Sequence, residues 1–437
     1  MQNPYQAPES GGAAPTNIRQ QVLLLATAAS FMLYVDRYCL GDLLKYKMVR
    51  DELGLDNYQY GLALGAFFWP YAVCQVPAGW LADRFGPRHL LAIYVIGWSL
   101  FAAATGLAGG FVSLFLMRLG LGVMQAGAYP ASGNIVSRWV PLADRGGASA
   151  LISLGGRLGA AAAMISTSAL VAWSWRATMI IYGVIGCGVG VVFHLIARDR
   201  PEQHPQINAA ELELIAGGRA AAADASPPPH VRQILRQVLS SGSMWAMCVA
   251  QFTTNIGWVF LVLWLPPYLI EERHFSTQWG ANMNAITLFA GMFGLLLGGR
   301  LTDLISRRWG LRHGRALPVA LSRFLAAGGC LAVPYIESPT GCIIAFCVVS
   351  IGTDLGIPGM WAYMQDVGGR NVAAVLGWGN MAGNFGGAIA PVLILGTCQV
   401  GDTIDWNKAL FVCGSAFILS GIASFFIDAT KPLAEAG

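Results

Sequence analysis

Long apolar stretches dominate the chain. Residues 90–117, 237–270 and 371–401 each hold no Asp, Glu, Lys or Arg. A helix needs about 20 apolar residues to cross the hydrocarbon core of a bilayer, so each stretch is long enough to span a membrane. The stretches lack the period-two alternation of transmembrane strands, which favours helices over a barrel. The pattern therefore predicts an all-α membrane protein.

We expect twelve membrane-spanning helices in two halves. Their predicted bounds are 20–40, 60–81, 88–108, 111–135, 146–170, 176–197, 244–270, 279–305, 314–335, 340–364, 371–397 and 407–428. A polar break at residues 198–240 contains three consecutive prolines, 227–229, and a short amphipathic piece at 211–215. We interpret this break as a cytoplasmic linker between six-helix halves at 20–197 and 241–428. Residues 1–19 and 429–437 are then cytoplasmic tails.

Composition narrows the class further. Only 11% of the 437 residues are charged and 55% are hydrophobic, whereas soluble domains carry roughly 25% charged residues. This excludes a disordered chain and an ordinary cytosolic enzyme, and a formal net charge of +4 is too small to indicate a nucleic-acid partner. The nine cysteines lie mostly in apolar runs without ligand spacing, so we expect packing roles, no metal and no cofactor.

Basic residues set the expected topology. Lys and Arg concentrate in the segments on one side of the predicted bilayer, which places both termini in the cytoplasm. The first nineteen residues show no cleavable signal peptide. We therefore expect a multi-pass protein of the inner (plasma) membrane, surrounded by lipid and acting as a monomer.

The two halves repeat each other. Gly79-x-x-x-Asp83 ends the second predicted span, and Gly299-x-x-x-Asp303 ends the eighth. Residues 154–160 read LGGRLGA, and residues 382–388 in the eleventh span read AGNFGGA. Two six-helix repeats around a central linker are the architecture of alternating-access transporters.

One motif carries a resemblance to a known family. Residues 79–88 read GWLADRFGPR, which resembles the GxxxDRxGxR signature of the major facilitator superfamily. Further motifs together are similar to its anion:cation symporter family of sugar-acid, sialic-acid and glutamate carriers: YVDR at 34–37, YAVCQVPAG at 71–79, AGAYP at 126–130, WLPPYL at 264–269 and GNMAGN at 379–384. The resemblance implies the major facilitator fold and symport of a small organic anion with protons.

The signature predicts a gate at the cytoplasmic side. Asp83, and Asp303 in the second half, would pair with basic groups on neighbouring helix ends in one conformation and release them in the other. Arg84 and Arg88 either share in this gate or only enforce the topology. The second copy is degenerate, because its arginines come later than the signature requires.

Charges inside predicted spans are the main candidates for function, since each costs roughly 3 kcal/mol or more at the bilayer centre. Asp36 and Arg37 are about 100° apart on a helix and do not face each other. We expect Arg37 to bind a substrate carboxylate and Asp36 to exchange a proton, roles that the resemblance also implies. The alternative is a structural ion pair or snorkelling to the outer interface.

Two further arginines are candidates for anion binding. Arg118 and Gln125 share a helix face, and the resemblance implies a glutamate for proton coupling at the position of Gln125, which cannot titrate. Arg118 would then serve the anion, or anchor near the outer headgroups. Arg157, between glycines, is either a second anion clamp or a partner for a carboxylate such as Asp354. Asp354 is alternatively a second proton site.

Four other residues complete the predicted site. Asn380 and Asn384 form an i, i+4 pair for substrate hydroxyls or for an interhelical hydrogen bond. The resemblance implies that Tyr71 and Trp361 stack on the substrate, although buried aromatics commonly serve packing. The sequence thus predicts a proton-coupled transporter of a sugar acid. The alternatives are a proton-independent anion or phosphate exchanger or uniporter, and a transporter-like sensor; no acid/base constellation indicates an enzyme.

Overall fold

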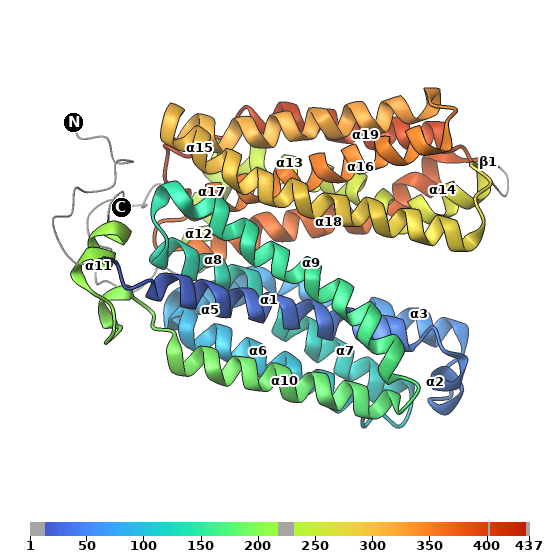
Figure 1. Ribbon diagram of the computed structural model, residues 1–437, viewed down its shortest axis with the longest axis horizontal. Helices are drawn as coiled ribbons and strands as arrows, with labels where there is room; N and C mark the ends of the chain where they lie inside the picture. Colours follow the sequence, from blue (N-terminus) through green and yellow to red (C-terminus); the bar gives the residue numbers. More distant parts are fainter. Residues whose placement is uncertain (1–13, 217–230, 401–402, 434–437) are drawn as a thin grey trace. The chain divides into compact units, whose positions relative to one another are not determined.

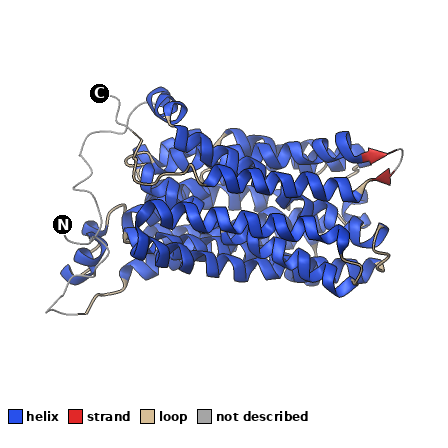
Figure 2. Cartoon of the chain, turned by 90° about the horizontal axis from the view of Figure 1, so that it is seen from above, coloured by secondary structure: helices blue, strands red, loops and turns tan. Residues whose placement is uncertain are grey.

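The computed structural model describes residues 14–216, 231–400 and 403–433. Figure 2 shows that this part is almost entirely helical; its two strands, β1 (Gln399–Val400) and β2 (Thr403–Ile404), form one short antiparallel pair. The prolines at 227–229 and the outer parts of both predicted tails lie outside the described residues.

The chain divides into two compact units. Unit 1 comprises the described residues within Met1–Leu142, Leu151–Val231 and Gly368–Gly377, and unit 2 those within Ala143–Ala150, Arg232–Val367 and Trp378–Gly437. The helices up to the linker (Figure 1) are α1 (Ile18–Leu43), α2 (Lys47–Glu52), α3 (Asn57–Gly65), α4 (Phe68–Val73), α5 (Gln75–Phe85), α6 (Pro87–Thr105), α7 (Phe111–Gln125), α8 (Ala128–Trp139), α9 (Arg145–Leu170), α10 (Trp175–Ile196) and α11 (Ala209–Ala216), with 3-10 turns at Leu142–Asp144 and Pro201–Gln203.

The second part of the chain continues the helical pattern. Its helices are α12 (Val231–Ser240), α13 (Gly242–Val259), α14 (Leu265–Glu271), α15 (Thr277–Ala332), α16 (Pro339–Leu355), α17 (Ile357–Val367), α18 (Val372–Cys398) and α19 (Trp406–Ser424), with a π-helical turn at Phe260–Trp264 and a 3-10 turn at Val333–Tyr335. Helices α9 and α18 each begin in one unit and continue in the other: α9 begins in unit 2, and α18 begins in unit 1.

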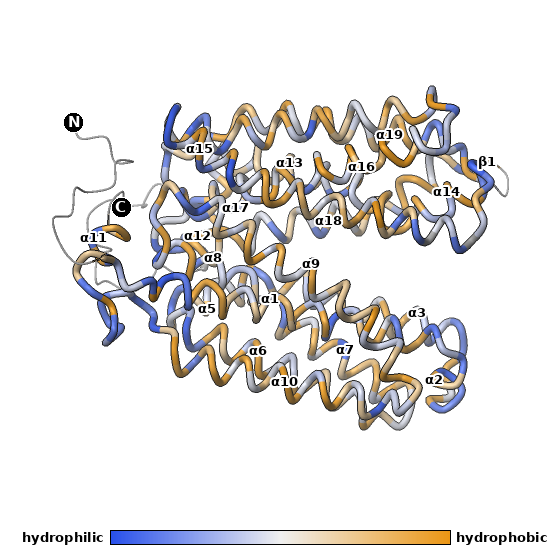
Figure 3. Tube along the Cα trace, in the orientation of Figure 1, coloured by the Kyte–Doolittle hydropathy of each residue, from blue (hydrophilic) through white to orange (hydrophobic). Residues whose placement is uncertain are grey.

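Each predicted span lies on one helix, on part of a long helix or on several consecutive helices. Ten helices in the described part are long and apolar enough to cross a membrane, and eleven if a bent pair counts as one. The longest segment, Gln278–Tyr335, holds the eighth and ninth predicted spans, which join across Gly310, where φ is 81°. Figure 3 shows apolar residues along the lengths of these helices and polar ones gathered towards many of their ends. The prediction of an all-α membrane protein is confirmed.

Several spans are interrupted where proline removes a backbone donor. The second span bends by 50° between Asn57–Val73 and Gln75–Phe85, and the break falls between Pro70 and Pro77. The tenth span is interrupted at Gly356, two residues before Pro358. Such breaks change the direction in which side chains point within the membrane, which a straight helix would not do.

The repeated glycine motifs hold equivalent helices together. A Cβ on Gly159 of α9 would lie 2.2 Å from the carbonyl oxygen of Phe31 on α1. In the second repeat, a Cβ on Gly386 of α18 would lie 2.0 Å from the carbonyl oxygen of Phe252 on α13. Only glycine permits these backbone approaches. The repeat seen in the sequence therefore corresponds to the same packing of a fifth helix on a first helix in each unit.

The described part of the linker is attached to unit 1. The fully buried carboxylate of Glu211, on α11, accepts hydrogen bonds from the amides of Ile18 (3.0 Å) and Arg19 (2.9 Å) and from the Thr16 hydroxyl (2.6 Å). These amides have no partner inside α1, and the helix N-terminus attracts a negative charge. The amphipathic piece predicted in the linker thus caps the first transmembrane helix.

Candidate functional site

Arg37 lies in a cage of aromatic rings in unit 1. Its guanidinium carbon is 4.4 Å from the ring centre of Tyr71, 4.8 Å from Phe67 and 5.0 Å from Tyr34. Its Nε donates to Gln125 Oε1 at 3.0 Å, and its Nη2 is buried with no hydrogen-bond partner in the described part of the chain. We call these five residues the Arg37 cluster. A fixed guanidinium with an unoccupied donor is suited to an anion.

Gln125 is held at both ends of its amide. Its oxygen accepts from Arg37, and its nitrogen donates to the carbonyl oxygen of Leu33 at 2.9 Å. The residue is fully buried on α7. An uncharged amide therefore orients Arg37 where a carboxylate would neutralise it.

Arg118 lies beside the same cluster. It is 4% exposed, and its guanidinium carbon is 5.2 Å from the ring centre of Phe67. Its Nη1 donates to the carbonyl oxygen of Arg37 at 3.5 Å and its Nε to that of Ala63 at 3.4 Å. The structure thus brings together Arg37, Arg118, Gln125 and Tyr71, and Arg118 is buried.

Asp36 turns away from Arg37. Its Oδ2 accepts from the Ser99 hydroxyl on α6 at 3.2 Å, and its Oδ1 is buried without a partner among the described residues. A Cβ on Gly186 of α10 would lie 3.4 Å from Oδ2, so three helices enclose the carboxyl. The predicted separation of Asp36 from Arg37 is present in the structure, whereas Ser99 had no signal in the sequence beyond being a polar residue within a span.

Arg157 is half-buried on α9, next to tyrosines of unit 1. A Cβ on Gly156 would lie 2.8 Å from both the hydroxyl of Tyr129 and the ring of Tyr34, so this glycine admits the rings. Arg157 interacts electrostatically with Tyr38. Tyr34, Tyr38 and Tyr129 were not among the residues predicted for the site, whereas Tyr71 was.

Three predicted substrate-binding residues lie in unit 2. Trp361 is buried on α17, and Asn380 and Asn384 are half-buried on α18. Asn384 donates to the carbonyl oxygen of Asn380 at 2.8 Å, so its amide is bound within its own helix. Their role in substrate binding stays a prediction.

Asp354 has a cationic neighbour that the sequence analysis gave no role. The carboxylate is 3% exposed at the end of α16 and interacts electrostatically with the fully buried Arg323 of α15. Arg323 also donates to the carbonyl oxygens of Thr353 (2.5 Å) and Gly352 (3.2 Å). An arginine in the middle of a span is the signal that could have identified this partner.

The two GxxxD motifs bind helix N-termini. Asp83 accepts from the amides of Ala373 (3.0 Å) and Ala374 (2.9 Å) at the start of α18, and from Asn134 at 2.5 Å. A Cβ on Gly79 would lie 2.3 Å from the Ala373 carbonyl oxygen, so glycine is required for this approach. In this structure Asp83 binds the positive end of a helix, and Arg138, in the last turn of α8, interacts with it electrostatically.

The second copy repeats this geometry. Asp303 accepts from the amides of Gly146 (2.9 Å) and Gly147 (2.7 Å) at the start of α9. The arginines of the first signature have other roles: Arg84 is exposed over Trp80, while Arg88 donates through its amide to Asp199 and through Nε to the carbonyl oxygen of His194. Asp303 also interacts electrostatically with Arg315. The gating role of the two aspartates stays a prediction.

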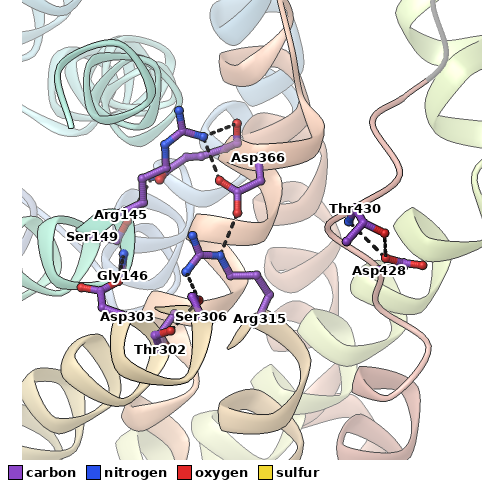
Figure 4. A network of polar contacts seen from close by, with 11 residues as sticks. Arg145, Gly146, Ser149, Thr302, Asp303, Ser306, Arg315, Asp366, Asp428 and Thr430 are labelled. Carbon is purple, nitrogen blue, oxygen red and sulfur yellow. Dashed lines mark hydrogen bonds and ion pairs between the residues drawn. The ribbon is translucent and has the colours of Figure 1, made fainter. Parts of the chain in front are cut away.

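A buried ion network adjoins Asp303 in unit 2 (Figure 4). Asp366, whose side chain is 1% exposed, accepts from Arg145 Nη1 at 2.8 Å and from Arg315 Nε at 2.7 Å. Arg315 is fully buried and also donates to Ser306 at 3.0 Å. The sequence analysis had counted both arginines only towards topology.

Comparisons with known proteins identify the family and the fold. A family model described as Major Facilitator Superfamily matches residues 26–391. The chain is 29% identical over 421 residues to the probable sulfoacetate transporter SauU of Cupriavidus necator, and 29% identical over 429 residues to the probable galactarate/D-glucarate transporter GarP of Escherichia coli; each match covers 94% of both chains. The solved proton:xylose symporter XylE has a TM-score of 0.70 at 13% identity, over 96% of this chain and 98% of that one, which shows a common fold.

Proposed function

Because the chain belongs to the major facilitator superfamily, we propose that it is a secondary transporter of a small organic anion that works by alternating access. Membership confirms the prediction of a multi-pass membrane transporter rather than an enzyme. The observation that carries the proposed substrate class is the buried Nη2 of Arg37, which has no hydrogen-bond partner among the described residues. The same guanidinium is fixed by its Nε bond to Gln125 and by three aromatic rings. Relatives named for sulfoacetate and for galactarate and glucarate support an acidic substrate.

In the proposed site, Arg37 binds an acid group of the substrate, and Tyr71 covers it. Arg118 adds positive charge, and Arg157 contributes from α9. Trp361, Asn380 and Asn384 of unit 2 are further proposed substrate-binding residues. The roles of Arg37, Tyr71 and Arg118 are supported by their side-chain chemistry and by their positions around one aromatic cluster. The other roles are supported by side-chain chemistry alone.

Proton coupling is assigned to Asp36. Its carboxyl is enclosed by three helices, with one hydroxyl donor and one oxygen without a partner in the described part of the chain. A carboxyl in such surroundings is costly to keep ionised without a cation, which suits a group that is protonated in part of the cycle. Asp354, beside Arg323, is the second proposed proton site.

Proton-independent exchange is the second candidate function. It is favoured by Gln125, a fully buried amide that contacts Arg37 and cannot titrate. In an exchanger, binding of one anion to the arginines would take the place of proton binding.

The GxxxD contacts are the proposed gate. Asp83 holds the start of α18, and Asp303 holds the start of α9. Each is a set of hydrogen bonds from a carboxylate to exposed helix amides, which can break and re-form without a covalent change. We assign the protein to the bacterial inner membrane, with both termini in the cytoplasm and one chain as the working unit.

Uptake by purified protein in proteoliposomes tests this function. With sulfoacetate and galactarate as probes, we expect accumulation driven by an inward proton gradient. Asp36→Asn should abolish accumulation and retain counterflow exchange, whereas Asp42→Asn on the same helix, where Lys45 is the partner at 2.5 Å, should retain both.

Two results would decide against the proposal. Wild-type uptake that ignores the gradient, with Asp36→Asn behaving as wild type, would replace symport by exchange. Preference for a neutral sugar over every organic anion would overturn the substrate class.

A further inference from the structure

Two guanidinium groups share one aromatic ring in unit 1. The guanidinium carbons of Arg37 and Arg118 lie 4.8 Å and 5.2 Å from the centre of the Phe67 ring, so they are no more than about 10 Å apart. Arg118 also donates to the backbone carbonyl of Arg37 at 3.5 Å, so the two residues are in contact. An anion bound at Arg37 therefore experiences both charges.

Neither guanidinium is balanced by a carboxylate of the described chain. The hydrogen bonds of Arg118 go to two backbone carbonyls, and that of Arg37 goes to Gln125. The acidic neighbour in sequence, Asp36, binds Ser99 instead. Aromatic faces and carbonyls stabilise a cation in part, but they do not neutralise it. The arginine pair thus presents two positive charges to a bound ligand.

Gln125 is the residue that keeps this charge at two. Its Oε1 lies 3.0 Å from Arg37 Nε, the distance at which a carboxylate would form an ion pair. Its other end is fixed by Leu33, so the amide oxygen is directed at the guanidinium. The same position filled by an acidic side chain would leave a site with one net positive charge.

We propose that the Arg37 cluster and Arg118 select a compact organic dianion over a monoanion of the same size, and that Gln125 sets this preference. This inference rests on the proposed transport of organic anions and specifies their charge. A second negative charge on the ligand, even about 10 Å from a guanidinium, is worth about tenfold in affinity at the effective dielectric of a partly hydrated protein site.

Matched ligand pairs test the preference in the full-length protein in detergent. Galactarate and galactonate share a six-carbon hydroxylated chain and differ in one carboxylate. Sulfoacetate and isethionate share a sulfonate and differ by a carboxylate replaced with a hydroxymethyl group. By calorimetric titration, we expect the dianion of each pair to bind at least about tenfold more tightly. Galactitol serves as the neutral control.

Variants then locate the determinant. Gln125→Glu should lower the dianion-to-monoanion affinity ratio by about tenfold, because it adds a negative charge at hydrogen-bond distance from Arg37. Gln125→Met removes the same hydrogen bond without a charge and should keep the ratio. Arg118→Gln should lower the ratio as Gln125→Glu does. The carboxylate of Gln125→Glu would face the Leu33 carbonyl, and this variant could fail to fold for that reason. In that case the titrations of the wild type and of Arg118→Gln still decide the test.

The outcomes distinguish failure of the dianion inference from failure of the proposed anion transport. Equal binding of galactarate and galactonate, and of sulfoacetate and isethionate, by the wild type would overturn the dianion inference while leaving anion transport intact. Stabilisation by galactitol alone would overturn the proposed function itself. An unchanged ratio in a folded Gln125→Glu protein would overturn the assignment to Gln125.

Discussion

Removing the carboxylate of Asp366 should destabilise the protein more than any other single change at the GxxxD end of unit 2. Asp366 accepts hydrogen bonds from Arg145 and Arg315, whose side chains are 9% and 0% exposed. Asp366→Asn keeps the size of the side chain and removes its charge. The two arginines then lose the negative charge between them while staying buried.

The magnitude follows from this burial. Breaking a buried ion pair by removing one partner costs about 3–5 kcal/mol, because the remaining charge stays desolvated. For a unit of some 200 residues, each kcal/mol corresponds to about 2–4 °C, so the apparent melting temperature should fall by more than about 6 °C. Asp144→Asn is the matched control: it breaks an ion pair with Arg307 whose side chains are 40% and 52% exposed, and such pairs contribute no more than about 1 kcal/mol.

The assay is thermal unfolding in detergent, followed by tryptophan fluorescence and by retention of the monodisperse peak. Combining Asp366→Asn with Arg315→Gln should recover part of the loss, because it removes one uncompensated charge. A melting temperature for Asp366→Asn equal to that of the Asp144→Asn control would refute the reasoning that this network is balanced by its central carboxylate.

Three further changes have defined outcomes. Gly79→Ala places a Cβ 2.3 Å from the Ala373 carbonyl oxygen and should reduce proteoliposome uptake strongly, whereas Gly61→Ala, with open space around the Cβ, should not. Glu211→Gln weakens the cap of α1 and should lower stability by about 1–2 kcal/mol in thermal unfolding. Hydrogen bonds from an indole and a guanidinium at the start of α10 lower the pKa of Glu52, so its contribution to stability is present above the ordinary pKa of a glutamate and is lost as the pH falls. The difference in melting temperature between wild type and Glu52→Gln should therefore be larger at pH 7 than at pH 3.

The helices could be predicted from the sequence because membrane insertion depends on runs of apolar residues, which are a one-dimensional property. The bend near Cys74 and the join at Gly310 could not, because proline and glycine mark a weakness in a helix without fixing what the backbone does there. The glycine repeat was identified as a pattern, but its packing on the first helix of each half required the backbone positions.

The candidate site was predictable where a charge lies inside an apolar run. Arg37 and Arg118 stand out for that reason, and they lie on the same ring. The aromatic residues around them were harder to predict, because such residues occur in most of the spans. Phe67 stands in no quoted motif, and Tyr34 was quoted within YVDR without a role of its own. Asp366 and its arginines were missed for a different reason: basic residues at helix ends satisfy the topology rule whether or not they also form a buried network.

The central claim, that the planar fork of Arg37 binds the substrate acid group, is tested most directly by the affinity of Arg37→Lys. Lysine keeps the positive charge but loses the fixed pair of donors. The dissociation constant of wild type and variant should be measured for sulfoacetate and galactarate, with the melting temperature of each protein without ligand recorded in parallel. We predict binding weakened by at least about tenfold in a protein that melts like the wild type. Affinity within twofold of the wild type for the preferred anion would contradict the claim.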